Sequence, residues 1–446
     1  MPHRPPLSVP APGTDRPGAG LPARTFVCLL LPALVLTLWL SAASAQQGWT
    51  PVITDHPYSP ETLLAVDKHA QTFMLLTRQS PLRVVGTYPC TTGQAPGDKI
   101  VQGDLKTPEG VYFVGYRVPR GLDFELFGDI AYTLNYPNPV DQLKGKTGAG
   151  IWLHGRGKQL VPRDTRGCVA LKNPDISSLA PVLTSGTPVV IANQLTIEEQ
   201  PGPDVQAAEE MAGLVQRWAT DWQTKSDDFF RLYDPARFAR TTGARFDGFV
   251  THKRSIFARQ PWIQVMVGNI HAVPGPDYWV TWFDQYYRTP GMASTVGKRL
   301  YWMQDDKGQW RIVGREYATA SEDLEPKYVA AKTEEAKGIV DAWREAWQSG
   351  DLDAYMGWYG RDARQGERRG AQAIADYKRG IWQSKPPAHV AVKDLEIRLS
   401  PDGLEANFIQ EYQDATGYSD RGVKTLILAP ADDGWRIVDE QWRSLS

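Results

Sequence analysis

Residues 151–171 read IWLHGRGKQLVPRDTRGCVAL, and this stretch decides how the first half of the chain is organised. A short apolar run ends in His154, a polar loop follows, and a second apolar run begins directly after Cys168. Short β-branched and aromatic runs between turn-forming segments are typical of strands. We therefore expect a strand that delivers a histidine, followed 14 residues later by a cysteine.

The same alternation continues on both sides of this stretch. Strand-like runs separated by Gly and Pro turns occur at 63–66, 73–76, 82–88, 110–114 and 188–191. They predict a mostly-β domain over residues 62–195. One short helix is expected at 173–183, where Asn-Pro-Asp supplies a helix start.

Cys168 and His154 are the candidate nucleophile and general base. A free thiol, with a pKa of about 8.5, is mostly protonated at neutral pH and needs a base or a nearby cation. His154 can accept the thiol proton and later return it to a leaving amine. Arg166 adds positive charge, the backbone N–H groups of Gly167 and Cys168 are candidate oxyanion donors, and Thr165 can bond within the loop or hold substrate.

Other interpretations of these residues exist. A cysteine and a histidine in a β domain are also compatible with a buried thiol and a hydrogen-bonded imidazole. The seven His and three Cys of the chain have no spacing typical of zinc ligands, so we predict no metal site and no cofactor.

The stretch resembles the L,D-transpeptidase (YkuD-type) signature, a His-Gly followed by Ser/Thr-x-Gly-Cys. His154 and Gly155 match the first part, and residues 165–168 match the second. Upstream, residues 103–112 (GDLKTPEGVY) are similar to the family's Thr-Pro-x-Gly segment, and residues 92–93 to its preceding Ser/Thr-Gly strand end. The resemblance covers residues 62–195.

This resemblance implies a β-rich fold with the thiol in a cleft and a peptidoglycan stem tetrapeptide as donor. Cys168 would attack the L-centre carbonyl of the third residue, expel the terminal D-amino acid and leave a thioester. An amine acceptor then gives transpeptidation, and water gives carboxypeptidation. A backbone carbonyl commonly orients the histidine in this family, and Thr165, Arg166 and Gly155 are expected near the substrate.

Ala170 departs from the family pattern, because many members carry Arg two residues after the cysteine. We hypothesise that Arg156 or Arg163, both in the loop before Cys168, supplies the missing cation for substrate binding. Cys90 follows Tyr-Pro at a strand end and is interpreted as structural, with a disulfide to Cys168 as the alternative.

The first 45 residues are interpreted as a secretory signal. A Pro-rich leader with three arginines precedes the apolar run 26–40 and then Ala-Ser-Ala at 43–45. An uncleaved anchor is the alternative, but 15 residues with an internal proline are short for a span of about 20. We expect an exported protein of a Gram-negative periplasm, with an N-terminal segment at 46–61 and no stable membrane span after cleavage.

The second half of the chain contains an internal repeat. A linker at 196–203 precedes two segments, 204–325 and 326–446, in which several motifs recur at an offset of 125 residues. The recurring pairs are Trp218 and Trp222 with Trp343 and Trp347, Phe283 and Tyr287 with Phe408 and Tyr412, and WRIV at 310–313 with WRIV at 435–438. One offset for a helix and two strands predicts two copies of one α+β domain.

Each copy resembles the nuclear-transport-factor-2-like (SnoaL-like) family, in which helices pack into the mouth of a curved sheet to form a cone. The predicted fold class is therefore multidomain, with a mostly-β YkuD-type catalytic domain and two tandem α+β cone domains. This combination resembles cell-shape-determining L,D-carboxypeptidases and transpeptidases. We expect the cones to bind or scaffold, with other envelope proteins as candidate partners. Asp284 with His271 and Glu411 with Asp439 are the weaker candidates for a second active site.

With a net charge of −2, the protein has no overall positive field that would attract nucleic acid or an anionic membrane surface. The sequence thus favours a peptidoglycan L,D-transpeptidase or L,D-carboxypeptidase. The alternatives are a non-catalytic wall-binding protein and an amidase that releases a wall-attached lipoprotein.

Overall fold

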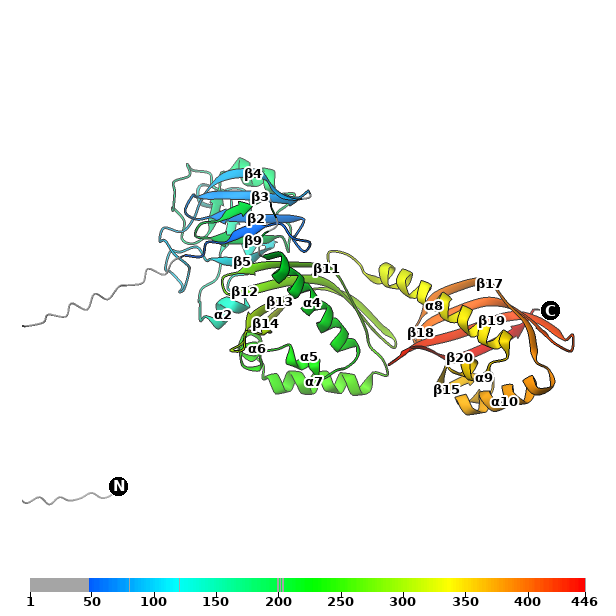
Figure 1. The fold of residues 1–446 in the computed structure, drawn as a ribbon. Coiled ribbons are helices and arrows are strands. Elements are labelled where there is room, and N and C mark those ends of the chain that lie inside the picture. The colour runs from blue at the N-terminus through cyan, green and yellow to red at the C-terminus, as the bar shows by residue number, and fades with distance from the viewer. Residues whose placement is uncertain are drawn as a thin grey trace, which may run out of the picture. The chain divides into compact units, whose positions relative to one another are not determined.

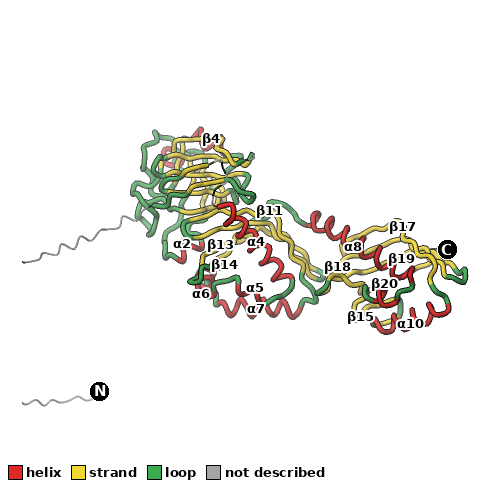
Figure 2. The backbone as a smooth tube through the Cα atoms, in the orientation of Figure 1, coloured by secondary structure: helices red, strands yellow, loops and turns green. Residues whose placement is uncertain are grey.

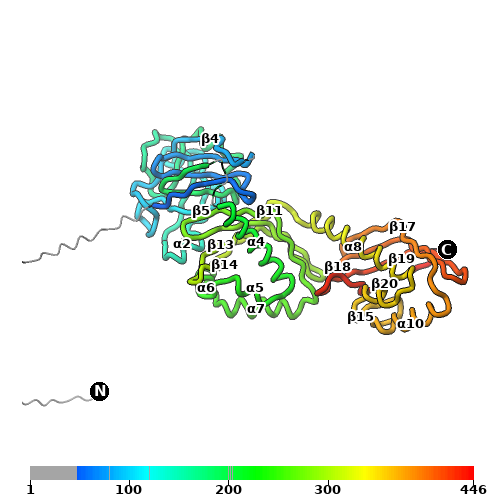
Figure 3. Tube along the Cα trace, viewed as in Figure 1, coloured from blue at the N-terminus to red at the C-terminus, as the bar shows by residue number. Residues whose placement is uncertain are grey.

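The computed structural model describes residues 48–79, 81–119, 121–198, 200, 202 and 204–445. The predicted signal peptide at 1–45 lies outside these residues. Within the described part of the chain, no helix has the length and apolar character needed to cross a membrane. Figure 3 follows the chain from the N-terminal strands in blue, through green, to the C-terminal strands in red.

Eight strands close into a barrel in the order β2-β3-β4-β8-β7-β6-β5-β9. Their bounds are β2 Thr62–Asp67, β3 Thr72–Arg78, β4 Leu82–Thr91, β5 Gly110–Arg117, β6 Ala131–Leu134, β7 Trp152–His154, β8 Val169–Leu171 and β9 Pro188–Ala192. Every strand predicted from the apolar runs is present. A barrel of this size is filled by its own side chains, here a cluster that includes Leu64, Tyr112, Leu153 and Ile191.

Three short helices connect the barrel strands: α1 Phe124–Phe127, α2 Pro139–Leu143 and α3 Asn173–Leu179. The predicted helix at 173–183 is therefore present but four residues shorter at its C-terminal end. Pro181 lies just beyond that end and lacks the backbone N–H that a further helical turn needs.

The linker predicted at 196–203 contains a strand. β10, Thr196–Glu198, pairs in parallel with β1, Val52–Thr54, with Ile53 opposite Ile197. Thr and Ile are β-branched residues that favour extended backbone, and the predicted N-terminal segment supplies the partner strand. The first three residues of the segment predicted as a linker are therefore paired with β1.

Copy 1 of the repeat packs helices against a four-stranded antiparallel sheet, β11-β12-β13-β14 (Figure 1). Its elements are α4 Asp204–Gln223, α5 Asp228–Arg231, α6 Pro235–Thr242, α7 Phe246–Arg259, β11 Gln264–Gly275, β12 Tyr278–Thr289, β13 Met292–Gln304 and β14 Trp310–Ala318. Figure 2 shows the long helix α4 in red beside the yellow strands. Trp218 and Trp222 of α4 stack edge-on, 5.1 Å apart, within the core.

Copy 2 repeats this arrangement around a six-stranded sheet, β16-β15-β20-β19-β18-β17. Its elements are α8 Glu325–Ser349, α9 Leu352–Met356, α10 Ala371–Ser384, β15 Tyr359–Gln365, β16 Arg368–Arg369, β17 Pro387–Ser400, β18 Gly403–Asp414, β19 Ser419–Ala431 and β20 Gly434–Ser444. Trp343 and Trp347 stack edge-on at 5.2 Å, as their counterparts do in copy 1. The predicted fold class, with a mostly-β domain and two α+β copies, is confirmed.

The barrel and copy 1 share an apolar core. Val111 and Phe113 of β5 belong to the same buried cluster as Tyr278 and Tyr301 of the copy 1 sheet. The Tyr278 hydroxyl also accepts a hydrogen bond from the backbone N–H of Val111 at 2.8 Å. Residues of copy 1 are thereby held beside the catalytic domain.

Copy 2 should lose stability in acid through Glu440. Burial alone would raise the pKa of this carboxyl, but the charges of Lys424 and Lys378 outweigh it and lower the pKa to about 2. A carboxyl with a folded pKa below its unfolded value stabilises the fold above the unfolded pKa, and this contribution is lost as pH falls toward the folded pKa. The shift corresponds to roughly 3 kcal/mol.

This prediction is checked by urea unfolding of wild type and Glu440→Gln at pH 7 and pH 3. The difference in the free energy of unfolding between wild type and Glu440→Gln should be smaller at pH 3 than at pH 7. An advantage that is unchanged at pH 3 would contradict it.

Candidate active site

The two predicted catalytic residues lie on neighbouring strands. β7 and β8 pair in parallel, with His154 opposite Ala170, and Cys168 directly precedes β8. Opposite residues of paired strands share a face, as do residues two apart in extended chain. His154, Ala170 and Cys168 are therefore placed on the same side of the sheet.

His154 is set up as a neutral base. Its Nδ1 lies 2.6 Å from the carbonyl oxygen of Gly155, and because a carbonyl only accepts, Nδ1 carries the proton and Nε2 is the free acceptor. Phe127 of α1 packs against the imidazole at 5.2 Å. Burial lowers the pKa of His154 to about 4, with a smaller lowering from Arg156. The imidazole is thus neutral at neutral pH, with its single proton on Nδ1.

Cys168 is set up as a neutral thiol. The side chain is half-buried, and its Sγ lies 3.6 Å from the carbonyl oxygen of Gly150, to which the S–H donates. Burial raises the pKa of the thiol, opposed by a hydrogen bond to the backbone of Trp152 and by the charge of Lys99. The resting pair is therefore thiol and imidazole, and the thiolate has to form during attack.

The loop before Cys168 is held by hydroxyl groups. Thr165 Oγ1 donates to the Cys168 carbonyl at 2.7 Å and accepts the Gly167 N–H at 3.1 Å, and Thr107 Oγ1 also donates to the Cys168 carbonyl at 3.4 Å. Of the two roles predicted for Thr165, the structure shows bonding within the loop. Because the Gly167 N–H is already used, the Cys168 N–H is the better candidate for the oxyanion donor.

Gly167 has a steric reason to be glycine. Its φ is +125°, a conformation that side chains rarely adopt. A Cβ built at this position would also lie 2.8 Å from the backbone oxygen of Lys106. Any side chain here would shift the backbone next to the nucleophile.

The other residues predicted to bind substrate differ in how far they are exposed to solvent. Gly155 is buried, and its carbonyl orients His154. Arg156 is 5% exposed and forms an ion pair with Asp164 within the loop. Arg163 is half-buried, whereas Arg166 is exposed. Arg166 is therefore the most accessible of the three arginines.

Arg156→Ala should loosen the loop, because it leaves the Asp164 carboxylate without this partner, while Arg163→Ala and Arg166→Ala should test direct contact with substrate. Stem-peptide affinity and thermal stability, measured together for the three variants, separate the two effects. Unchanged affinity in both Arg156→Ala and Arg163→Ala would reject the hypothesis that either one replaces the family arginine.

Several residues that support the site were missed by the sequence analysis. Lys99 acts on the thiol from a distant loop and pairs with Asp104 at 2.8 Å. The side chain of Gln71 accepts the backbone N–H groups of Thr92 and Arg163. No spacing in the sequence relates these residues to Cys168, so only the fold shows their role.

A buried lysine holds the segment that contains Thr107. Lys68 Nζ donates to the carbonyl oxygens of Gly97 and Thr107, both at 2.7 Å, and pairs with Glu109 at 2.9 Å. Lys68 and Glu109 are both almost fully buried. This pair therefore holds the loop from which Thr107 donates its hydrogen bond to the Cys168 carbonyl.

Cys90 belongs to the barrel core. It is 4% exposed and lies opposite Leu171, whereas Thr91 lies opposite Ala170. By the alternation of faces, the Cys90 side chain points away from the face shared by Ala170 and Cys168. Both cysteines of the described chain are unpaired, and this geometry favours the structural interpretation of Cys90.

A groove of about 830 Å³ includes Gly150, whose carbonyl oxygen accepts the Cys168 S–H, in its lining. It is lined by Gly150 and Trp152 from the catalytic domain and by Arg299 and Tyr317 from copy 1. The Arg299 guanidinium lies 3.9 Å from the ring centroid of Phe113. The groove therefore combines residues next to Cys168 with a cation and an exposed aromatic ring from copy 1.

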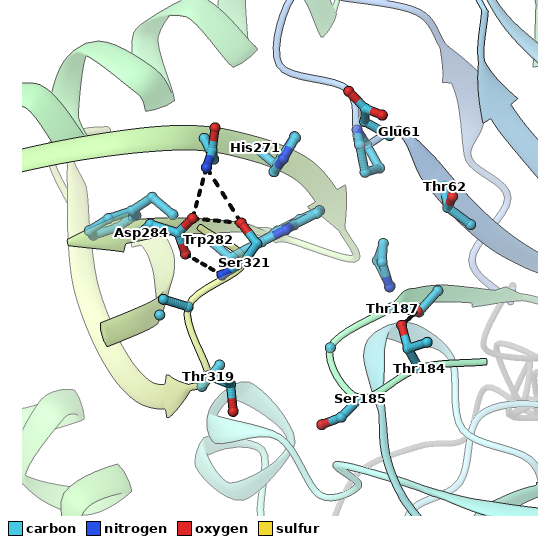
Figure 4. A pocket seen from close by; sticks show the side chains of 18 of the residues that line it. Glu61, Thr62, Thr184, Ser185, Thr187, His271, Trp282, Asp284, Thr319 and Ser321 are labelled. Carbon is cyan, nitrogen blue, oxygen red and sulfur yellow. Dashed lines mark hydrogen bonds between the residues drawn. The ribbon is translucent and has the colours of Figure 1, made fainter. Parts of the chain in front are cut away.

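A second cavity, of about 850 Å³, contains Asp284 and His271 (Figure 4). The Asp284 carboxylate accepts hydrogen bonds from Asn269 and from the backbone N–H groups of Ser321 and Glu322. His271 Nδ1 instead lies 3.3 Å from the backbone oxygen of Ser59. Asp284 is thus occupied in holding the 321–322 turn rather than a neighbouring base.

The other candidate acid-base residue also has structural partners. Glu411 pairs with Lys393 at 2.8 Å and with Arg421 at 3.3 Å on the surface of copy 2. Among the residues described, no group of three His, Cys, Asp or Glu side chains is placed to hold a metal ion.

The profile of the L,D-transpeptidase catalytic domain (YkuD) matches residues 61–191. Residues 61–191 are an L,D-transpeptidase catalytic domain. The profile of the Cds6 C-terminal NTF2-like domain matches twice, at residues 210–316 and 336–441. The resemblances stated from the sequence, including the repeat, are confirmed, and the L,D-transpeptidase domain carries His154 and Cys168.

Two solved structures are similar to this chain over the YkuD domain and the NTF2-like region. Bd1075 of Bdellovibrio bacteriovorus is 25% identical with a TM-score of 0.50, over 60% of this chain and 95% of its own. The helical cell shape determining protein Pgp2 of Campylobacter jejuni is 27% identical with a TM-score of 0.45, over 57% of this chain and 91% of its own. No curated protein sequence matches the chain.

Alkylation should distinguish a resting thiol from a resting thiolate. Because burial raises the pKa of Cys168, iodoacetamide should react with it slowly at pH 7 and faster as pH rises toward 9. Cys90 is the internal control, since burial raises its pKa to about 12 and the folded protein shields it. Peptide mass spectrometry measures both rates, and a Cys168 rate already maximal at pH 6 would contradict the neutral pair.

Proposed function

We propose that this protein is a peptidoglycan acyl transferase that acts on stem tetrapeptides through a Cys168 thioester. The observation that carries the proposal is the bond between His154 Nδ1 and the Gly155 carbonyl. It leaves Nε2 as the acceptor on a strand directly paired with the strand that follows the thiol. This is the arrangement that a neutral thiol requires for activation.

In the first step, His154 Nε2 takes the thiol proton as Cys168 Sγ bonds to the L-centre carbonyl carbon of the third residue. The Cys168 N–H is placed to stabilise the developing oxyanion. The imidazolium then returns the proton to the amine of the terminal D-amino acid, and the C–N bond breaks. The third residue remains on Cys168 as a thioester.

The second nucleophile decides the product. Water releases a tripeptide, and the amine of a neighbouring stem peptide forms a 3-3 cross-link. In both cases His154 removes a proton from the nucleophile and the thiol is regenerated. We place the stem peptides in the groove that contains Gly150, between the catalytic domain and copy 1. Arg166 and Arg299 are the candidate cations for the carboxylates of these peptides.

The site of action follows from this substrate. A stem peptide lies outside the inner membrane, so we propose an exported protein of the periplasm, in agreement with the signal peptide expected at residues 1–45. Pgp2, to which the chain is similar, is a helical cell shape determining protein, and we propose a role in cell shape here as well. The NTF2-like copies would then bind wall or envelope components.

Incubating purified protein with muropeptides tests the proposal. Tripeptide without cross-links indicates carboxypeptidation, and 3-3 cross-links after addition of an amine acceptor indicate transpeptidation. Release of a wall-attached lipoprotein would indicate the amidase alternative. Identical absence of product from wild type and Cys168→Ala would favour a non-catalytic wall-binding protein.

A further inference from the structure

The interior of copy 1 gathers three cations. Lys253 of α7 is 9% exposed, Lys298 of β13 is 5% exposed, and Arg315 of β14 is half-buried. The Nζ atoms of Lys253 and Lys298 lie 3.4 Å and 4.6 Å from the centroid of the Trp222 ring. Among the residues that the structure describes, no carboxylate is paired with any of the three. The elements that carry them are labelled in Figure 1.

The equivalent positions of copy 2 are balanced by an acid. Strand register aligns the two copies, because Lys298 lies opposite Phe283 and Lys424 opposite Phe408, residues that are 125 apart. On the next strand, Arg315 lies opposite Leu300 and Glu440 lies opposite Leu426. Each of these leucines is two residues after the corresponding lysine, Lys298 or Lys424. Glu440 therefore occupies in copy 2 the place that Arg315 occupies in copy 1.

This exchange reverses the charge of the interior. In copy 2, Glu440 forms a buried ion pair with Lys424 and is also the largest influence that raises the pKa of Lys378. In copy 1, Arg315 occupies the position of Glu440, so a third cation replaces the acid. Buried charges in proteins are normally paired, because desolvation of an isolated charge is strongly unfavourable.

The titration of the lysines agrees with an uncompensated cluster. Burial, with the charge of Arg315, lowers the pKa of Lys253 to about 7. Burial, with the charges of Lys253 and Arg315, also holds the pKa of Lys298 well below its ordinary value. The other titratable side chains beside the cluster are tyrosines, Tyr317 against Lys298 and Tyr287 against Trp222. No carboxylate contributes to either lysine.

A neighbouring donor is unsatisfied as well. The indole Nε1 of Trp222, whose ring contacts both lysines, is buried and has no hydrogen-bond partner. An indole N–H can only donate, so it lacks an acceptor here, as does its counterpart Trp347 in copy 2. An anion bound in the interior would supply negative charge and acceptor oxygens together.

We propose that the interior of copy 1 binds a small anion with at least two negative charges, held by Lys253, Lys298 and Arg315. The shared chemistry is that of a dicarboxylate or a phosphate, both of which match the planar donors of an arginine. Binding draws the lysines into their charged form, so the protein takes up protons as the anion binds. The site is separate from Cys168 and does not depend on the proposed reaction.

Calorimetry on the full protein at pH 6.5 and constant ionic strength tests this site. Phosphate and succinate should bind, whereas acetate and chloride should bind at least tenfold more weakly, and comparison of phosphate with succinate identifies the preferred source. Arg315→Glu, which installs the residue of copy 2, should weaken binding by about 10- to 100-fold. Arg315→Gln serves as a second variant that removes the charge without adding an acid.

The matched control is Arg311→Gln. Arg311 lies on the same strand as Arg315 but pairs with Asp305, so this variant removes a cation outside the cluster. It should leave anion affinity unchanged. Affinity in the wild type should fall between pH 6.5 and pH 8.5, as Lys253 loses its proton, and the apparent heat should depend on the buffer's ionisation heat. No binding by either anion, or equal losses in Arg315→Gln and Arg311→Gln, would overturn the proposal.

Discussion

Cys168→Ala should abolish product formation from muropeptides, with a loss of at least about 10⁴-fold, because no other group in the site can form the thioester. His154→Ala should reduce the rate by about 10²–10⁴-fold, the range for removing a general base. The two losses should not add in the double variant, since base and nucleophile act in the same step. Product analysis by liquid chromatography measures all three.

Cys90→Ala is the matched control for the nucleophile. It removes the other cysteine, which faces the barrel core, and should leave the turnover of the folded protein close to that of the wild type. Substantial residual activity in Cys168→Ala would contradict the assignment. Full activity in His154→Ala would show that another group takes the thiol proton.

Lys68→Met should destabilise the catalytic domain by about 3–5 kcal/mol, because it leaves Glu109 buried without its cation. It also removes the donor to the Gly97 and Thr107 carbonyls, so the loop beside the nucleophile should open. Denaturant unfolding gives the loss of stability, and hydrogen exchange reports on residues 97–109. Lys68 has a lowered pKa because of its burial, which Glu109 opposes.

The double variant Lys68→Met with Glu109→Leu distinguishes an unpaired charge from lost packing. Replacing both partners with apolar side chains should recover much of the stability, because a buried ion pair often contributes little relative to apolar residues of similar size. A surface pair offers the contrast, and Lys327→Met, whose partner Glu322 is exposed, should change stability by less than about 1 kcal/mol. Equal losses from Lys68→Met and Lys327→Met would contradict the structural role of the buried pair.

The candidate catalytic residues could be proposed from the sequence because their chemistry is local. His154 with Gly155, and Thr165 through Cys168, are contiguous motifs, and each lies at a strand end that the apolar runs already indicate. The internal repeat was predicted for a similar reason, since a constant offset is visible without any knowledge of contacts. The strand at 196–198 was not predicted, because the pairing of β10 with β1 joins residues more than 140 positions apart.

The sequence by itself determined the class of each domain and the existence of two copies, and it was enough to propose the nucleophile and its base, because all of these depend on residue identity and spacing. Only the tertiary structure decided that the Gly167 N–H is occupied by Thr165, that Arg156 is held by Asp164, and that Lys99 influences the thiol. Strand register also showed that Lys298 and Lys424, which are 126 residues apart, occupy equivalent positions in the two copies, so that Arg315 replaces Glu440 beside a buried lysine. Electrostatic environment depends on which groups share a buried space, and that is a property of the fold.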